Sequence, residues 1–371
     1  MKRLIDICDI QYGYAFDSKC FTEDSSYPQL VRIRDVKRGY SETYYSGDYP
    51  EEYILSEGDL LVGMDGEFNI ARWKCSGALL NQRVCKLVAK IGTNEEYLRF
   101  AMSKSLKEIE QRTAFVTVKH LSAKELNKLE LDVPELTKQD KIADILSRLE
   151  RVIEARKEEL EELDGLIKAR FVEMFGDPVT NPKGLPIVAL GELSKLITKG
   201  ASPSWQGFSY TDDSSQTIFV TSENVREGYI DLSSPKYIED GFNEKQKRSV
   251  IHKGDFLINI VGASIGRAAQ FNLDCKANMN QAAALVRVND SRVRDKYLLT
   301  YLNSDRAQRM YDSMKSDTGR ANLSLQDISD LLILLPNVEQ QIEFEMFANQ
   351  VDKSKFVLQK KFQIIHYSDI I

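Results

Sequence analysis

The sequence predicts a mixed α/β (α+β) protein with two tandem copies of one domain, each followed by a long helix. Three observations support this: motifs recur in the same order in both halves, strand-like runs precede helical segments in each copy, and a heptad-patterned segment follows each copy. The expected parts are a first domain at residues 1–136, a helix at 137–176, a second domain at 177–336 and a helix at 337–371.

The internal repeat is the strongest of these signals. The offset between the copies grows from 186 residues at Leu4/Leu190 to 202 at Pro134/Pro336. Such drift is what loop insertions produce between two copies of one fold, whereas chance matches do not stay in order. The matched segments are 4–13 with 190–200, 31–39 with 220–228, Gly58-Asp59 with Gly254-Asp255, Ile70-Ala71-Arg72 with Ile265-Gly266-Arg267, Asn81-Gln82 with Asn280-Gln281, and 129–134 with 331–336.

Each copy follows one plan of secondary structure. Residues 29–36 alternate between apolar and polar side chains, and residues 59–63 form a short apolar run, so both predict strands. Helices are expected near residues 95–111 and 296–315, and a final apolar strand ends at a proline in each copy.

The long helices carry apolar side chains at sevenfold spacing. The first runs from about Thr137 to Phe175, where Gly176 and Pro178 are stop signals. The second begins near Asn337. We expect the two helices to pack as an antiparallel coiled coil, with the first touching more than one neighbour because its stripe is wide. The alternative is two unrelated amphipathic helices that each pack on their own domain. The sevenfold series are Ile142, Leu149 and Leu163; Ile145, Val152 and Leu166; Leu146, Ile153, Leu160 and Ile167; and Phe344, Val351, Leu358 and Ile365.

Composition indicates a globular protein of the cytoplasm. Apolar residues make up 42% and charged residues 29%, and the apolar run at residues 331–336 is far too short to span a bilayer. No signal peptide is expected at the N-terminus. The five cysteines have no CxxC spacing, which favours reduced thiols. The net charge of −6 argues weakly against binding to nucleic acid. This charge is a sum over the whole chain, however, and much of the acid lies in residues 150–164, so it does not exclude basic patches elsewhere.

Taken together, the duplicated motifs resemble the DNA-specificity (S) subunits of type I restriction–modification systems over essentially the whole chain. Further segments that support this resemblance are Leu335-Pro336 followed by Glu339-Gln340-Gln341-Ile342, the looser first-copy match at residues 137–142, and the stretch at residues 174–184. The resemblance implies two target-recognition domains that each read half of a bipartite DNA site. It also implies a helical rod that sets the spacer and docks methyltransferase subunits, two being expected. Restriction subunits would join these, so that S-adenosylmethionine, ATP and magnesium belong to partners.

The residues themselves predict neither a catalytic nor a metal site. The chain has no Walker A loop and no Asn-Pro-Pro-aromatic tetrapeptide of an adenine methyltransferase, and its histidines at 120, 252 and 366 are scattered. Asp65 and Glu67 beside a strand leave a nuclease-like metal site as an alternative, but the second copy has Val261 and Ala263 there. A solitary modification or restriction enzyme and a protein-binding scaffold remain the alternative functions.

Candidate DNA-reading residues follow from comparing the copies. Residues identical in both are expected to be scaffold, with a shared phosphate contact at Arg72 and Arg267 as an alternative. Base reading is expected where the copies diverge: 11–21 against 199–210, 64–69 against 260–264, and the segments before the final strands. Interleaved cationic, amide and aromatic side chains suit contacts in DNA grooves. The candidates are Tyr12, Tyr14, Lys19, Arg72, Lys119, His120, Lys199, Ser202, Trp205, Gln206, Tyr210, Arg267, Arg320 and Asn322.

Overall fold

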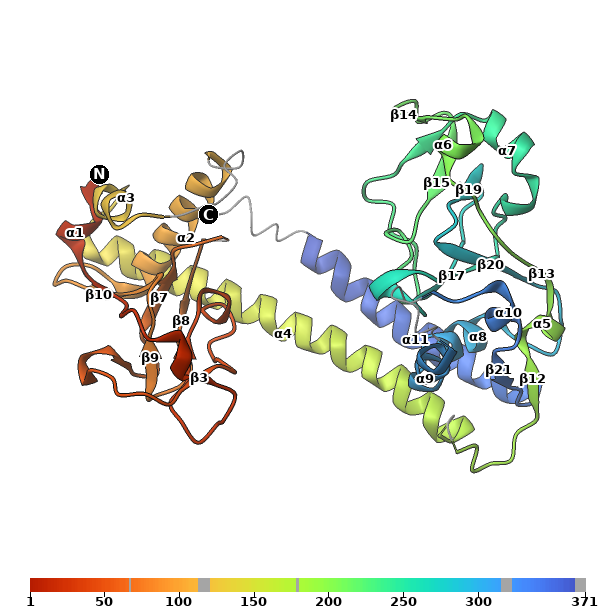
Figure 1. Ribbon diagram of the computed structural model, residues 1–371, viewed down its shortest axis with the longest axis horizontal. Helices are drawn as coiled ribbons and strands as arrows, with labels where there is room; N and C mark the ends of the chain where they lie inside the picture. Colours follow the sequence, from red (N-terminus) through yellow and green to blue (C-terminus); the bar gives the residue numbers. More distant parts are fainter. Residues whose placement is uncertain (67, 113–120, 178–179, 315–321, 364–371) are drawn as a thin grey trace. The chain divides into compact units, whose positions relative to one another are not determined.

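The computed structural model describes residues 1–66, 68–112, 121–177, 180–314 and 322–363. Two compact units divide the chain, one holding Met1–Lys157 and the other Glu158–Lys361. Each unit has its own sheets and helices (Figure 1), and each has an apolar core of its own. None of the described helices combines the length and apolar character needed to cross a membrane.

The first unit is built around an antiparallel sheet with the strand order β2-β10-β7-β8. Side chains alternate between the two faces of such a sheet. One face, with Leu60 and Val62, packs against Leu98 and Met102 of α2, and the other face contributes Leu61 to a second core. The sheet is therefore covered on both sides. The elements are β2 (Cys8–Tyr12), β10 (Val84–Ala89), β7 (Leu60–Gly63), β8 (Asn69–Arg72) and α2 (Glu95–Arg112).

The second unit repeats this sheet in the same order, β13-β20-β17-β18, which confirms the duplication. The helix expected over residues 296–315 is interrupted at Asn303. Its side-chain amide donates to Ala268 O and its carbonyl accepts from Ala268 N, both at 2.9 Å, as a neighbouring strand would. The elements are β13 (Ser194–Lys199), β20 (Ala283–Val288), β17 (Phe256–Asn259), β18 (Ala268–Gln270), α8 (Asp295–Leu302) and α9 (Asp305–Met314).

A smaller sheet lies beside the main one in each unit, with the orders β4-β9-β6 and β14-β16-β15-β19. Each contains one parallel pair at the same place in the repeat, β4 with β9 and β15 with β19. The strand expected over residues 29–36 is shorter than predicted, because the chain turns into η2, where Asp35 accepts a hydrogen bond from Arg32 N at 3.0 Å. The elements are β3 (Phe21–Thr22), β4 (Leu30–Val31), η2 (Ile33–Asp35), β5 (Tyr44–Tyr45), β6 (Ile54–Leu55), β9 (Ala78–Leu80), β14 (Tyr210–Thr211), β15 (Thr217–Val220), β16 (Tyr237–Ile238) and β19 (Ala277–Met279).

The first and last strands of each copy pair with each other. Leu4 N donates to Leu129 O at 2.8 Å, and Leu190 N donates to Leu331 O at 2.9 Å, which confirms the outermost sequence matches. The pairs are β1 (Lys2–Arg3) with β11 (Glu130–Leu131) and β12 (Ile187–Ala189) with β21 (Leu332–Leu334). The remaining short helices are α1 (Leu4–Ile7), η1 (Ser18–Cys20), η3 (Glu51–Tyr53), α3 (Ala123–Lys128), α5 (Leu190–Leu193), α6 (Pro203–Gln206), α7 (Gly241–Lys245), η4 (Lys247–Ser249), η5 (Gly262–Ser264) and α10 (Leu325–Ser329).

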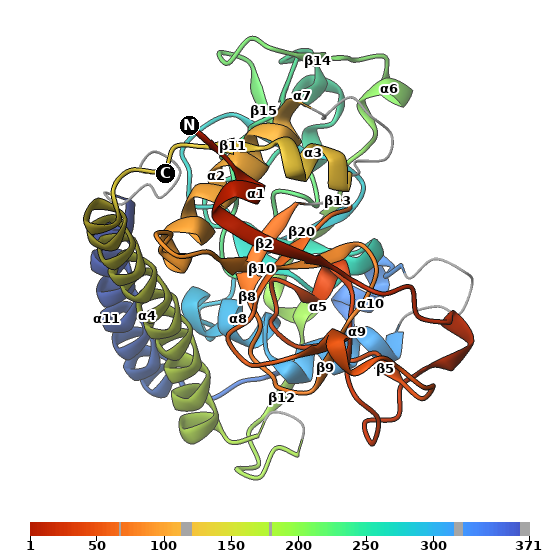
Figure 2. The same ribbon diagram turned by 90° about the vertical axis from the view of Figure 1, so that its left-hand side faces the viewer.

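The two long helices are α4 (Leu136–Phe175), within one residue of its predicted bounds, and α11 (Val338–Gln363), which begins one residue after its predicted start. The predicted end of the second helix, at residue 371, lies outside the described residues. From Glu158 onward α4 lies alongside α11 (Figure 1, Figure 2). Ion pairs join Asp164 to Lys355 and Arg170 to Glu343, so the numbering falls along one helix as it rises along the other. Within the second unit the predicted antiparallel packing is therefore present.

The packed face of α4 in this unit is aromatic as well as aliphatic. Phe171 and Phe175 each meet Phe344 of α11 edge to face, with ring centroids 5.4 and 5.7 Å apart. Phe171 also stacks on Tyr297 of α8 at 5.4 Å, so α4 contacts more than one neighbour, as expected. One predicted apolar series stays largely exposed, namely Ile145, Val152 and Leu166.

A single glycine weakens α4. Gly165 lies within the helix, and a Cβ built there has no other atom within 4 Å. Replacing Gly165 with alanine should therefore raise the free energy of unfolding by about 1 kcal/mol, the usual difference between these residues in an exposed helix. Thermal or urea unfolding of the chain measures the effect. Ala169→Gly, at another exposed position of the same helix, should lower stability by a similar amount. An unchanged midpoint for both variants would contradict the expectation.

Candidate nucleic-acid interface

The Gly-Asp motif that recurs in both copies is a turn, and its residues hold the scaffold. Gly58 and Gly254 have φ of 91° and 96°, a backbone region that favours glycine. Asp59 Oδ2 accepts from Ser56 N at 2.8 Å, and Asp255 Oδ2 accepts from His252 N at 2.7 Å. These carboxylates fasten the start of β7 and β17, so the predicted scaffold role fits their contacts.

In the Asn-Gln motif the asparagine is buried in the first copy and half-buried in the second, whereas the glutamine is exposed in both. Asn81 and Asn280 use their side-chain oxygens to accept backbone N–H groups of the following turn, at 2.9 and 3.0 Å. Gln82 and Gln281 are exposed, and among the described residues neither side chain has a hydrogen-bond partner. Their identity in the two copies predicts a scaffold role for both glutamines. Exposed amides beside the variable loops are instead suited to hydrogen bonds with base edges.

In the first unit the variable loop presents Tyr14 and Lys19. Tyr14 is 42% exposed and leans on Phe16 and Tyr53, with centroids 5.1 and 5.2 Å away. Lys19 is exposed on η1. Tyr12 is half-buried, its hydroxyl donates to Asn127 Oδ1 at 2.8 Å, and desolvation raises its pKa to about 12. These contacts tie Tyr12 to the domain and leave Tyr14 and Lys19 as the accessible pair.

In the second unit the corresponding loop contains α6, which presents Trp205. This indole is 88% exposed and Tyr210 is 54% exposed. The backbone of the loop is nevertheless held by contacts with the rest of the unit. Lys245 of α7 donates to Gln206 O at 2.8 Å, and Phe208 packs edge to face on Phe242, with ring centroids 5.6 Å apart.

The remaining candidate residues of this loop differ in how exposed their side chains are. Lys199 is exposed and Ser202 is half-buried, with its hydroxyl 3.1 Å from that of Ser204. The side chain of Gln206 is half-buried and has no hydrogen-bond partner among the described residues. The backbone of the loop is therefore held, while several side chains stay available to a ligand.

The match of Arg72 with Arg267 is wrong by three residues. In the sheets Leu60 pairs with Arg72, and its counterpart Phe256 pairs with Gln270. Arg72 donates to Gly58 O at 2.6 Å and to Glu95 at 2.8 Å, and Gln270 donates to Gly254 O at 3.3 Å and to Asp295 at 2.7 Å. The two arginines therefore do not occupy equivalent positions, so a phosphate contact shared by both copies is not supported.

Taken singly, the two arginines also differ in their surroundings. The guanidinium of Arg72 is occupied by Glu95 and Glu96, which oppose any attraction to phosphate. Arg267 is exposed, and its side chain has no hydrogen bond or ion pair within the described ranges. Arg267 therefore stays a predicted phosphate contact.

The second divergent region offers little polar surface for reading. Met64 and Phe68 are each 5% exposed, so they belong to the core. Asp65 pairs with Arg83, and Glu67 lies outside the described residues. In the part of the chain that the structure describes, no cluster of three or more histidine, cysteine, aspartate or glutamate side chains is placed to hold a metal ion.

The third divergent region is described only at its end. Asn322 is exposed and forms an isolated bridge with Val261. Lys119, His120 and Arg320 lie outside the described residues, so they stay predictions.

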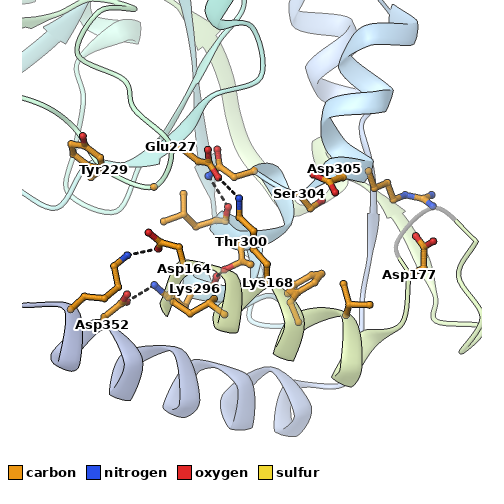
Figure 3. Close-up of a pocket in the computed structure, with 18 of the residues that line it drawn as sticks. Asp164, Lys168, Asp177, Glu227, Tyr229, Lys296, Thr300, Ser304, Asp305 and Asp352 are labelled. Carbon is orange, nitrogen blue, oxygen red and sulfur yellow. Dashed lines mark hydrogen bonds and ion pairs between the residues drawn. The ribbon is translucent and has the colours of Figure 1, made fainter. Parts of the chain in front are cut away.

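The second unit also contains a pocket of about 530 Å³ (Figure 3). Ion pairs line it, including Lys168 with Glu227 at 3.0 Å and Lys296 with Asp352 at 2.5 Å. None of the candidate reading residues is among its lining residues. Five acidic side chains balance five basic ones along its lining, so the lining has no excess of positive charge that would favour a polyanion.

The scaffold matches a known family. The family model described as the type I restriction modification DNA specificity domain covers residues 1–164 and 182–364. The specificity subunit of the type I restriction enzyme EcoBI of Escherichia coli is 31% identical over 377 residues, 93% of this chain and 77% of the relative. That of MjaVIII from Methanocaldococcus jannaschii is 20% identical over 303 residues, 78% of this chain and 71% of the relative.

Two solved structures share the fold. The S subunit of a type I restriction–modification system from M. genitalium superimposes with a TM-score of 0.55 at 14% identity, covering 98% of this chain and 91% of that one. A chain from a structure of the type I R-M system concerned with complex assembly and conformational transition gives 0.53 at 20% identity, covering 100% and 93%. At these identities the likeness concerns the fold.

Proposed function

The chain belongs to the family of type I restriction–modification DNA-specificity subunits, and we propose that its two domains each read one half of a bipartite DNA target. One observation carries the proposal: the same scaffold occurs twice with different exposed side chains on corresponding loops. Tyr12 and Lys199 occupy equivalent positions in their sheets, and the loops that follow present Tyr14 and Lys19 in one copy and Trp205 in the other. Two versions of one scaffold with different contact residues suit the reading of two different sequences.

We further propose that the domains end near residues 136 and 336 and that the long helices form the rod between them. The exposed apolar residues of the helices support a partner there, since such side chains on a rod favour burial against another protein. They include Ile145, Val152 and Leu166 on α4 and Met346 and Phe356 on α11. The partners proposed are two methyltransferase subunits, with restriction subunits joining them.

In this scheme the chain is non-catalytic, and S-adenosylmethionine, ATP and magnesium act in the partner subunits. The proposed place is the cytoplasm, where DNA is accessible and the five free thiols would stay reduced. Incubating the pure chain with DNA, S-adenosylmethionine and magnesium is expected to give neither methylation nor cleavage. Either product would favour the alternative of a solitary enzyme.

The reading role of Trp205 is tested by Trp205→Ala in the complex with the methyltransferase subunits. Discrimination between correct and incorrect bases in the second half-site should fall by about 1–3 kcal/mol, the usual value of one base contact. The measurement is the methylation rate on targets with single substitutions in either half-site. Tyr229→Ala, which removes an aromatic residue 59% exposed at the pocket, is the matched control and should change neither half-site. Equal weakening on all sequences would assign Trp205 to the DNA backbone instead.

A further inference from the structure

Two buried glutamines occupy the same place at the start of the two long helices. Gln139 is the fourth residue of α4 and Gln341 the fourth residue of α11, and they are 1% and 0% exposed. Both follow the terminal proline of their copy, Pro134 and Pro336, by five residues. The structure therefore repeats one arrangement in both units.

In the first unit Gln139 joins three segments. Its amide Nε2 donates to Pro134 O at 2.8 Å and to Gly92 O at 3.2 Å, and its Oε1 accepts from Asn94 N at 2.9 Å. The segments joined are the end of the domain, the loop before α2 and the first turn of α4. Asn94 adds a second tie, because its side chain donates to Asp140 at 2.7 Å.

In the second unit Gln341 makes the same set of bonds. Nε2 donates to Pro336 O and to Arg292 O, each at 2.8 Å, and Oε1 accepts from Arg294 N at 2.8 Å. Arg294 also pairs with Glu345 at 2.8 Å, as Asn94 pairs with Asp140. The backbone partners correspond one to one in the two copies.

Only a primary amide of this length satisfies such a site. It donates two hydrogen bonds and accepts one at the same time, which neither a carboxylate nor a thioether does. Because the site is buried, every alternative leaves backbone groups without partners, and that is costly. The first turn of each long helix is thus held to its domain in one orientation.

We propose that Gln139 and Gln341 are positioning residues that fix the direction in which each long helix leaves its domain, and thereby the spacer length that the subunit accepts. The inference rests on the proposed function, because a spacer exists only if two half-sites are read. A small change in the direction of the helix has a large effect at its far end. A tilt of about 5° at one end of a 40-residue helix, about 60 Å long, moves its other end by about 5 Å, more than the 3.4 Å rise of one base pair.

The test uses Gln139→Glu and Gln341→Glu in the full complex with the methyltransferase subunits. Each change keeps the shape of the side chain and removes both donated hydrogen bonds. Methylation is measured on DNA with the natural spacer and with spacers one base pair shorter or longer. Preference for the natural spacer should fall by at least about tenfold, the factor that corresponds to losing one buried hydrogen bond, while base discrimination within each half-site stays unchanged.

Gln340→Glu is the control, since it makes the same charge change at the adjacent, half-buried residue, whose side chain has no hydrogen-bond partner among the described residues. Its spacer preference should equal that of the unmodified complex. Gln341→Met repeats the measurement without a buried charge, in case the glutamate variants fail to assemble.

The outcomes separate the inference from the proposed function. If the unmodified complex shows no bipartite target, the proposed function fails. If it does, and the folded glutamine variants keep the natural spacer preference, or lose rate equally on all spacers, the glutamines are merely structural and the inference is overturned.

Discussion

Exchanging residues 1–157 for the same part of another family member should replace one half of the DNA target and leave the other half intact. The physical reason is that each unit has a core of its own, so the second unit keeps its reading loops when the first is changed. The new half-site should be preferred as strongly as the old one was, by a factor on the order of 10³ or more over unrelated sequences. Mapping the methylated sequences made by the exchanged complex measures this.

The junction after Lys157 is chosen from contacts within the first unit. The side-chain amide of Gln139 on α4 donates to Pro134 O of the domain, and Glu150 of α4 forms an ion pair with Arg99 of α2. A junction at residue 136 would combine a foreign domain with these two partners. The reciprocal exchange of residues 158–371 is the control and should change only the second half-site. A change in both halves from either exchange would show that the domains do not read independently.

The order of the elements was predictable from the sequence because the copies constrain each other. Matches near the ends of the repeat, Leu4 with Leu190 and Leu129 with Leu331, correspond to the same backbone hydrogen bonds in both units. The long helices were predictable because their heptad pattern is extensive and strong stop signals follow Phe175.

The incorrect match of Arg72 with Arg267 rests on a three-residue similarity that conflicts with the steady growth of the offset between the copies. Arg72 and Arg267 differ by 195 residues, although the offset is already 196 at Gly58 and should only grow. The strand register restores an offset of 198, between Arg72 and Gln270. The chain between β17 and β18 turns through η5, and no local pattern revealed where the strand resumed.

The sequence predicted which loops form the candidate site, but not which residues within those loops are accessible. Tyr12 and Tyr14 look alike in sequence, yet one donates to Asn127, more than one hundred residues away, and the other is exposed. Identity between copies was also a poor guide to burial, since it grouped the exposed Gln82 with the buried Asn81. Long-range contacts decide both cases, and a single sequence does not contain them.

Lengthening the rod should lengthen the spacer without altering the bases that are read. Four residues inserted after Lys157 add about 6 Å of helix, which corresponds to one or two base pairs. The insertion point lies between Glu150, which pairs with Arg99 in the first unit, and Leu163 and Asp164, which pack in the second, so these contacts stay on their own sides of the insertion. Four residues also rotate the helix by only about 40°, because one turn contains 3.6 residues.

The measurement is the methylated motif of the insertion variant, with a four-residue substitution at the same place as the control for altered composition. The two specific blocks should keep their bases, since no reading loop is touched, while the unspecified stretch between them grows. The substitution should leave the motif unchanged, because it alters neither length nor phase. If the insertion variant methylates DNA with the original spacer, a feature other than α4 sets the distance between the half-sites.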